Sequence, residues 1–264
     1  MPITEHITTL GVNVFRNCVS LSGQLDLSQI TNLSDGVFYG CSKIESVDLS
    51  SLKAIPYEAF RDCVSLKSVQ FSRSLKVVDR RSFQNVGVES LDLSYVEGLK
   101  IGEYAFCDNF SLKKLSLPDN CILDVGCFRN TTIQGPLIIK TGWTFIGGKH
   151  FDYCKELTYV EAEEGVTTIP YGLLGFTTQL KTVIFPSTIS EIGDSFLHGN
   201  GGLCTFICKA VVPPVIAGNG YVGYAPFSEM YVPDESVNAY KVAASWSTYA
   251  SKIKPMSMFV NSNE

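Results

Sequence analysis

The sequence holds one pair of residue types that could form a nucleophilic site, His150 and Cys154. A histidine close to a cysteine can accept the thiol proton and so activate a nucleophile. Both residues, however, occupy regular places in a repeat that is described below. His150 stands where Ala59 and Ala105 stand in other repeats, and Cys154 belongs to a recurrent cysteine column. We therefore expect structural roles for both residues and no catalytic residue.

Nine cysteines raise the question of disulfide bonds or a metal site. Cys18, Cys41 and Cys63 each follow a recurrent phenylalanine by three positions, which indicates a column of small buried side chains. Neighbouring repeats would place these thiols about 5 Å apart, which a disulfide tolerates, but three stacked cysteines cannot pair evenly. Cys204 and Cys208 would lie about 13 Å apart on one strand, too far for a single zinc ion. We predict reduced thiols, no metal and no cofactor.

The segment Gly218-Asn-Gly220-Tyr-Val-Gly223 matches the G-x-G-x-x-G pattern of dinucleotide-binding proteins. That pattern binds a pyrophosphate where it leaves a strand and opens a helix. Here it follows Pro213-Pro214 and runs into Pro226, and neither neighbour suits that context. We interpret the segment as a flexible loop.

A repeat that runs through most of the chain must position all of these residues. A phenylalanine, replaced once by leucine, recurs every 22 or 23 residues, at Phe15, Phe38, Phe60, Phe83, Phe106, Phe128, Phe151, Leu174 and Phe196. An aliphatic column precedes it by five residues, at Leu10, Leu33, Ile55, Val78, Ile101, Leu123, Ile146 and Ile169, with Ile192 one place out of register. Two columns with one period predict a stack of similar turns of chain.

Downstream of each phenylalanine comes the pattern L-x-x-L-x-L, as in Leu112-Lys-Lys-Leu115-Ser-Leu117. In an extended chain, residues two positions apart point to the same side, so the last two leucines face inward. Each repeat therefore predicts one short strand of a parallel sheet, with a short helical or irregular back around the phenylalanine. Because one repeat cannot bury a core alone, we predict an α/β solenoid of about nine leucine-rich repeats over residues 1–208.

The repeat pattern stops after Cys208. An uncapped solenoid would expose a core face and a sheet edge, so we predict a C-terminal cap over residues 209–256. Residues 234–249 have a helical pattern, with Asp234 as the N-cap. The residues expected on one face of this helix are Val237, Tyr240 and Ala244. We expect residues 257–264 to form a flexible tail.

The outward positions of the predicted strands form the surface that the sequence specifies best. In the first four repeats they are small, polar or acidic: Gln24, Asp26, Ser46, Asp48, Ser68, Gln70, Ser90 and Asp92. Later they become larger and more apolar: Lys114, Ser116, Pro136, Ile138, Tyr159, Glu161, Thr182, Ile184, Thr205 and Ile207. Because exposed apolar rows usually mark contact surfaces, we predict a ligand-binding face at Ile138, Tyr159, Glu161 and Ile184. Ordinary β-propensity, or coverage by the C-terminal loop, is the alternative.

Composition limits the class of partner. With 45% hydrophobic and 18% charged residues, the chain has the composition of a folded protein. A net charge of −5 argues against nucleic acid as a partner. No apolar run reaches the roughly 18 residues of a membrane-spanning helix. The first six residues lack the pattern of a signal peptide, so we expect either a cytoplasmic protein or a leader outside this sequence.

Three features of the sequence recur together in one known family. They are A-F-x-x-C-x-S-L at residues 59–66, Ile-Pro or Ile-Gly before it, and an ending with Pro213-Pro214, Tyr231-Val-Pro233, Ser236-Val237, Tyr240-Lys241, Trp246 and Ile253. In these features the chain resembles the BspA-like leucine-rich-repeat proteins. The resemblance implies a secreted or cell-surface protein of anaerobic bacteria or parasitic protists. Such repeats are associated with adhesion to host matrix proteins or other microbes, and the family has no known catalytic residues.

The expected function is thus a monomeric, non-catalytic module that binds a protein or glycan macromolecule across its open sheet. A carbohydrate-binding module, with Tyr159 as a stacking platform, is the first alternative. A structural spacer at the cell surface is the second.

Overall fold

The protein folds into two compact units, of which unit 1 comprises Met1–Ile133 and Gly142–Phe151 and unit 2 comprises Gln134–Thr141 and Asp152–Glu264. Each unit is a parallel β-solenoid with little helix, which confirms the predicted fold class. The computed structural model describes residues 7–201, 204–218, 220, 222 and 227–260.

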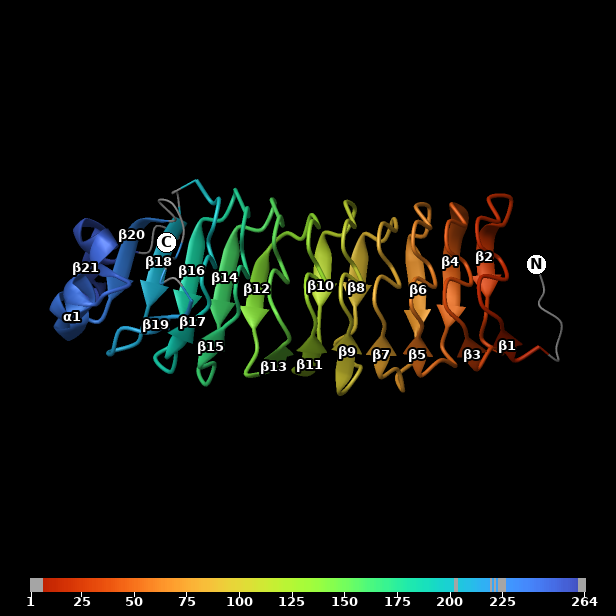
Figure 1. The fold of residues 1–264 in the computed structure, drawn as a ribbon, viewed down its shortest axis with the longest axis horizontal. Helices are drawn as coiled ribbons and strands as arrows, with labels where there is room; N and C mark the ends of the chain where they lie inside the picture. The colour runs from red at the N-terminus through yellow and green to blue at the C-terminus, as the bar shows by residue number, and fades with distance from the viewer. Residues whose placement is uncertain (1–6, 202–203, 219, 221, 223–226, 261–264) are drawn as a thin grey trace. The chain divides into compact units, whose positions relative to one another are not determined.

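The L-x-L segments form a first row of parallel strands in each unit (Figure 1). In unit 1 these are β2 (Ser22–Asp26), β4 (Lys43–Leu49), β6 (Ser68–Phe71), β8 (Ser90–Asp92) and β10 (Lys114–Ser116). In unit 2 they are β12 (Pro136–Ile139), β14 (Tyr159–Ala162), β16 (Thr182–Phe185), β18 (Cys204–Cys208) and β20 (Phe227–Val232). Equivalent inward residues pair, as Val47 does with Val69, so the inward columns expected from the sequence are correct here.

A second row of short strands lies at the aliphatic column, where the sequence analysis expected no strand (Figure 1). In unit 1 these are β1 (Thr9–Leu10), β3 (Asn32–Leu33), β5 (Ala54–Ile55), β7 (Val77–Val78), β9 (Leu99–Ile101), β11 (Asn120–Leu123) and β13 (Gly142–Phe145). In unit 2 they are β15 (Thr168–Ile169), β17 (Glu191–Ile192) and β19 (Val215–Ile216). Most have only two residues, too few to show the alternation that reveals a strand in a sequence.

Two members of the aliphatic column differ from expectation. Strand β13 pairs Phe145 with Leu123, and Ile146 is 43% exposed, so the assignment of Ile146 to the core was wrong. The turn between Phe145 and Phe151 is one residue longer than the equivalent turn between Leu123 and Phe128. The inward residue of this repeat is therefore Phe145, one position before Ile146. Ile192 is buried and pairs with Ile169, so it holds its place in the column. The missing residue of its repeat therefore falls in the turn between Ile192 and Phe196.

Turns rather than helical segments form the backs of the repeats. The N–H of Phe38 donates to the carbonyl of Ala59 at 2.9 Å, and that of Phe60 donates to Ser82 at 2.8 Å. Each donor is thereby used between repeats and cannot join the i to i−4 ladder of an α-helix. Glu58, with φ of 52°, further interrupts any helical path.

The recurrent phenylalanine rings form the core of unit 1. From Phe15 to Phe151, successive rings stack with centroids 5.3–5.6 Å apart and interplanar angles of at most 16°. In unit 2 the equivalent Leu174 is fully buried, and a tilted cluster of Phe185, Phe196 and Phe206 fills the core. In unit 1, each recurrent phenylalanine thus packs its ring against the rings of the neighbouring repeats.

The cysteines belong mostly to this interior. Eight of them, in the described part of the chain, are free thiols, and all of these except Cys18 are buried. The Cys41 thiol donates to the carbonyl of Phe15 at 2.9 Å, and the Cys63 thiol donates to Phe38 at 3.1 Å. Burial raises the pKa of Cys41 to about 11, which keeps the thiol protonated at neutral pH. The side chain of Cys204 lies outside the described residues.

Parallel pairing continues beyond residue 208 in unit 2, through β20 to β21 (Ile253–Pro255). The predicted helix over residues 234–249 is broken into η1 (Asp234–Ser236), α1 (Val237–Val242) and η2 (Ser247–Lys252). Asp234 does not cap a helix as expected, because its carboxylate accepts the N–H of Ser257 at 3.0 Å. Ala244 is exposed rather than buried.

Two buried aromatic residues hold this C-terminal segment. The Tyr240 hydroxyl donates to the carbonyl of Ala210, and the Trp246 indole N–H donates to Pro214, each at 2.8 Å. The Trp246 ring also stacks on Phe206 at 5.9 Å. In the segment expected to be a tail, η3 (Met256–Met258) precedes Phe259, whose ring lies 5.1 Å from that of Tyr231. We propose that residues 209–256 act as the cap of the repeats.

Replacing Phe83 with alanine should lower the free energy of unfolding by about 3–5 kcal/mol, because it removes a buried ring from the middle of the stack. Phe110→Ala is the matched control. That ring is 60% exposed, so the loss should stay within roughly 0.5 kcal/mol. Urea denaturation of both variants measures the difference, and equal losses would show that the stack is not the core.

Truncation after Cys208 should harm solubility and thermal stability more than deletion of residues 257–264. The first change removes the buried rings of Tyr240 and Trp246 and uncovers the apolar surface beneath them. Of the residues removed by the second change, Ser257, Met258 and Val260 are exposed. Comparing the soluble fraction and melting temperature tests the cap assignment, and similar behaviour of the two variants would contradict it.

Candidate functional site

The four residues predicted to bind a ligand lie on three neighbouring strands of unit 2. Between β12 and β14, Ile138 pairs with Glu161, and between β14 and β16, Glu161 pairs with Ile184. Tyr159 lies two residues before Glu161 on the same face of β14 and pairs with Thr182 of β16. The structure therefore brings all four together. We call this set, Ile138, Tyr159, Glu161 and Ile184, the outer face of unit 2.

Hydrogen bonding and charge fix the polar part of the outer face. The Tyr159 hydroxyl donates to a carboxylate oxygen of Glu161 at 2.7 Å. The other carboxylate oxygen lies 3.7 Å from the ammonium group of Lys209. Partial burial, together with the hydrogen bond to Glu161, raises the pKa of Tyr159 to about 12. The phenol therefore remains a donor at neutral pH, and its ring is held in place before any ligand arrives.

The outer face is half-buried, and its row of apolar side chains continues into covered surface. Ile138, Tyr159, Glu161 and Ile184 are all of intermediate exposure. The next residue in the row, Ile207, is only 4% exposed and pairs with Tyr231, on which the ring of Phe259 packs. The C-terminal segment thus covers the end of the row at Ile207, whereas Ile184 remains partly exposed.

A second cluster of the same composition follows on β20 and β21. The Tyr231 hydroxyl donates to Glu229 at 2.6 Å, and Lys254 pairs with the same carboxylate. The hydrogen bonds from Lys254 and Tyr231 lower the pKa of Glu229. This cluster was not predicted, although Glu229-x-Tyr231 places a carboxylate and a phenol two residues apart in the sequence, just as Tyr159-x-Glu161 does.

In unit 1 the outward acidic residues have a structural use. The carboxylates of Asp26, Asp48 and Asp92 each accept the backbone N–H of the serine two residues later, at 2.9, 2.9 and 3.0 Å. These bonds satisfy the chain as it turns away from the strand. Hydrogen bonds from Ser28 and Ser94 correspondingly lower the pKa values of Asp26 and Asp92.

His150 is part of the interior of unit 1. Its Nε2 lies 3.1 Å from the carbonyls of both Leu123 and Ile146, and its ring packs edge-on against Phe145 at 4.9 Å. Its carbonyl accepts the N–H of Phe128, as the carbonyl of Ala59 accepts that of Phe38. His150 therefore holds the expected place in the repeat, and burial lowers its pKa to about 4.

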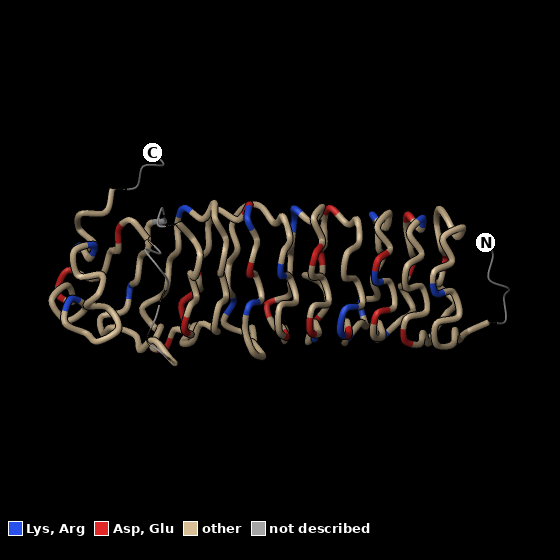
Figure 2. Tube along the Cα trace, turned by 45° about the horizontal axis from the view of Figure 1, so that its top comes forward, with Lys and Arg blue, Asp and Glu red and all other residues tan. Residues whose placement is uncertain are grey.

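Acidic and basic residues are interspersed along the described chain of each unit (Figure 2). Among the described residues no group of three metal-ligating side chains comes together. Likewise, no helix in the described ranges has the length and apolar character needed to cross a membrane. Three positions of the glycine-rich motif, 219, 221 and 223, lie outside the described residues.

Comparison with known proteins supports the repeat assignment. The family model for the BspA type leucine rich repeat region matches residues 1–99 and 97–204, with six copies. No curated protein matches the sequence.

Solved structures of leucine-rich-repeat proteins are similar to this chain at low sequence identity. A leucine rich cell surface protein of Faecalibacterium prausnitzii has 18% identity and a TM-score of 0.53, over 94% of this chain and 76% of that one. A leucine-rich repeat protein of Bacteroides ovatus has 18% identity and a TM-score of 0.43, over 95% and 88% of the two chains. The leucine rich repeat protein of T. pallidum has 20% identity and a TM-score of 0.44, over 76% and 85%.

The stability of unit 1 should fall as the pH drops from 6.5 to about 4 because of His150. The folded state keeps this imidazole neutral, whereas in the unfolded chain it takes up a proton below its ordinary pKa of 6.5. The contribution is therefore complete above pH 6.5, and up to roughly 3 kcal/mol is lost by pH 4. His150→Ala, the residue of the equivalent slots, should show a flatter profile of melting temperature against pH. An unchanged slope would exclude His150 as the cause.

Proposed function

Because the chain belongs to the BspA type leucine-rich-repeat family, we propose that it is a non-catalytic protein-interaction module that acts at the cell surface or after secretion. Its ligands would be host matrix proteins or proteins on other microbes, bound across the outer face of unit 2. The name of the Faecalibacterium prausnitzii structure, a cell surface protein, supports this location.

One observation carries the proposed binding site: the outer face combines apolar side chains with an aromatic ring that is already anchored. Ile138 and Ile184 flank Glu161 on adjacent strands, and Tyr159 is tied to that glutamate at 2.7 Å. An immobilised tyrosine loses little conformational entropy when a partner binds. The Tyr159 ring offers dispersion contact to a partner. Glu161 and Lys209, beside the ring, would form the polar rim of the interface.

The repeat architecture explains why such a surface can vary without harm to the fold. Inward residues such as Val160 are fully buried, and packing restricts them. Outward residues on the same strands, such as Tyr159, meet fewer constraints. A parallel sheet that presents several such rows is suited to a broad macromolecular ligand rather than a small molecule.

Two other functions compete with this one. A carbohydrate-binding module would use Tyr159 as a platform for a sugar ring, and a spacer would bind nothing. Binding of the full chain to immobilised matrix proteins and to a glycan array distinguishes them. Retention of matrix protein supports the proposal, retention of glycans that is lost in Tyr159→Ala favours the lectin-like alternative, and silence in both assays favours the spacer.

Tyr159→Ala should weaken binding of the retained protein by on the order of 1–2 kcal/mol without unfolding the solenoid, because it removes the aromatic contact from the centre of the site. Tyr171→Ala is the matched control, since Tyr171 is a 48% exposed tyrosine that follows β15, outside the outer face. Titration calorimetry with each variant measures the loss. Full affinity in a Tyr159→Ala, Ile184→Ser double variant would place the site elsewhere.

A further inference from the structure

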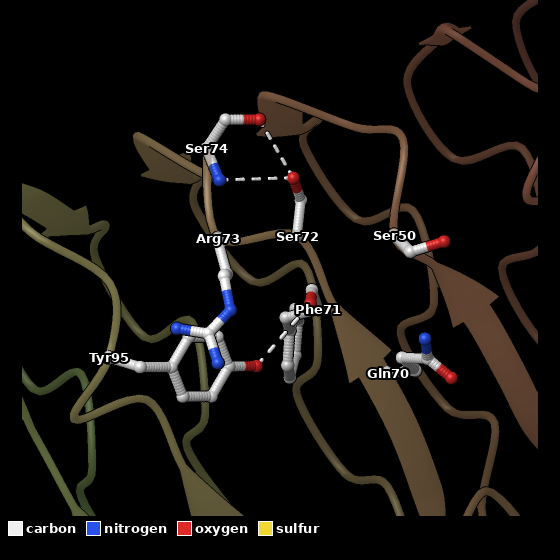
Figure 3. Close-up of a pocket in the computed structure, with 7 residues that line it drawn as sticks. All are labelled: Ser50, Gln70, Phe71, Ser72, Arg73, Ser74 and Tyr95. Atoms are coloured by element: carbon white, nitrogen blue, oxygen red, sulfur yellow. Dashed lines mark hydrogen bonds between the residues drawn. The ribbon is translucent and has the colours of Figure 1, made fainter.

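A hollow of about 530 Å³ opens in unit 1 beside the ends of β4 and β6 (Figure 3). Its lining consists of Ser50, Gln70, Phe71, Ser72, Arg73, Ser74 and Tyr95. None of these residues belongs to the outer face of unit 2. Arg73 is the one charged side chain in the lining, which is otherwise made of hydroxyl groups, one amide and two aromatic rings.

The hollow coincides with an irregularity in the stack. Strands β6 and β8 belong to different hydrogen-bonded sheets, so the first row of unit 1 is interrupted between them. Eight positions separate Phe83 from Leu91, whereas nine separate Phe60 from Val69 and Phe106 from Leu115. The segment between Phe83 and β8 is thus one residue shorter than in the other two repeats. The hydrogen-bonded ladder is interrupted at the same place, between β6 and β8.

Arg73 is held over this hollow by Tyr95, which occupies the equivalent position in the next repeat. The guanidinium carbon lies 5.3 Å from the centre of the Tyr95 ring, and the Tyr95 hydroxyl donates to the carbonyl of Phe71 at 3.3 Å (Figure 3). The ring is therefore fixed by a hydrogen bond, and it in turn orients the guanidinium group by a cation–π contact.

Among the described residues no carboxylate lies within salt-bridge distance of Arg73, whereas three other arginines of unit 1 have acidic partners. Arg61 pairs with Glu58, Arg80 lies 3.4 Å from Glu103, and Arg81 lies 3.9 Å from Glu58. In the described part of the chain, the guanidinium group of Arg73 instead rests on the Tyr95 ring. Its side chain is exposed, so its planar N–H donors are available to an anion from solution.

The sequence of the repeat loses an acidic residue at this place, which favours the binding of an anion. The residue two places before the serine of the turn is aspartate at Asp26, Asp48 and Asp92 but Gln70 in the repeat that carries Arg73. Gln70 removes a negative charge from the wall of the hollow and leaves an amide that can donate or accept. The hydroxyls of Ser72 and Ser74 lie 2.8 Å apart, and because their mutual hydrogen bond uses one hydroxyl hydrogen, the other hydrogen remains to donate to a ligand.

The surroundings also limit how much negative charge a ligand can carry. Asp48 pairs with Gln70 across the neighbouring strands. The charge of Asp92 contributes to the raised pKa of Tyr95, whose main cause is burial. A multiply charged phosphate ester or sulfated chain would be repelled by these carboxylates. A single carboxylate beside several hydroxyl groups suits the site better, because Arg73 binds the former and the serines and Gln70 bind the latter.

We propose that this hollow binds an acidic sugar, with its carboxylate on Arg73 and its ring hydroxyls toward Ser50, Gln70 and Ser74. Uronic acids and sialic acids share this chemistry. The site goes beyond the protein contact proposed for unit 2 and does not depend on it.

Titration of the full chain with sialyllactose and with methyl galactosiduronic acid, each of which carries a single carboxylate, tests the proposal, with lactose and the methyl ester of methyl galactosiduronic acid as neutral controls. We expect dissociation constants on the order of 1 mM for at least one acid and at least about tenfold weaker binding of its neutral counterpart. The acid that binds identifies the sugar class. Failure of both acids to bind at about 10 mM, or equal binding of acid and neutral forms, overturns the proposal.

Three variants then locate the site for the acid that binds. Arg73→Gln should weaken its binding at least about tenfold, and Gln70→Glu, which restores an acidic side chain to this row, should do the same without removing the arginine. Arg80→Gln is the control, because it removes an arginine charge at another place in unit 1 and should leave affinity unchanged. Melting temperatures show whether each variant is folded. Unaltered affinity in both Arg73→Gln and Gln70→Glu overturns the assignment to this hollow.

Discussion

The stacking of each repeat on the next is the contact on which the rest of each unit depends. In unit 1 it is most regular in the phenylalanine rings, which lie 5.3–5.6 Å apart from Phe15 to Phe151. Backbone hydrogen bonds follow the same direction, since the N–H of Phe60 donates to Ser82 of the next repeat. A repeat of this length cannot form a core alone. Its apolar side chains are therefore buried against the next repeat, and its backbone donors form hydrogen bonds with that repeat.

This arrangement separates stability from recognition. Inward positions such as Leu49 and Phe60 are fully buried and constrained by volume, whereas outward positions vary from Asp48 in unit 1 to Tyr159 in unit 2. The two candidate surfaces arise from this freedom in different ways. The outer face of unit 2 uses regular strand pairing to align Ile138, Glu161 and Ile184. The hollow of unit 1 uses an interruption of that pairing, between β6 and β8.

Sequence periodicity predicted the buried columns and the contiguity of the outer face, because strands in register align equivalent positions. It did not predict the second row of strands, since segments such as Val77–Val78 contain a single inward residue. It misplaced Ile146, where a longer turn moved Phe145 into the core. The broken helix near Trp246 also escaped prediction, because hydrogen bonds to Ala210 and Pro214 from distant aromatic residues outweigh local helical preference.

The sequence by itself determined the fold class, the repeat length, the place of His150 in the core and the family to which the chain belongs. These follow from residues that recur at one spacing and need no knowledge of their partners. Only the tertiary structure decided that Tyr159 donates to Glu161, that the ring of Phe259 packs on Tyr231, and that Arg73 rests on Tyr95. Such contacts depend on side-chain orientation and on the exact fit between adjacent repeats, which periodicity does not encode.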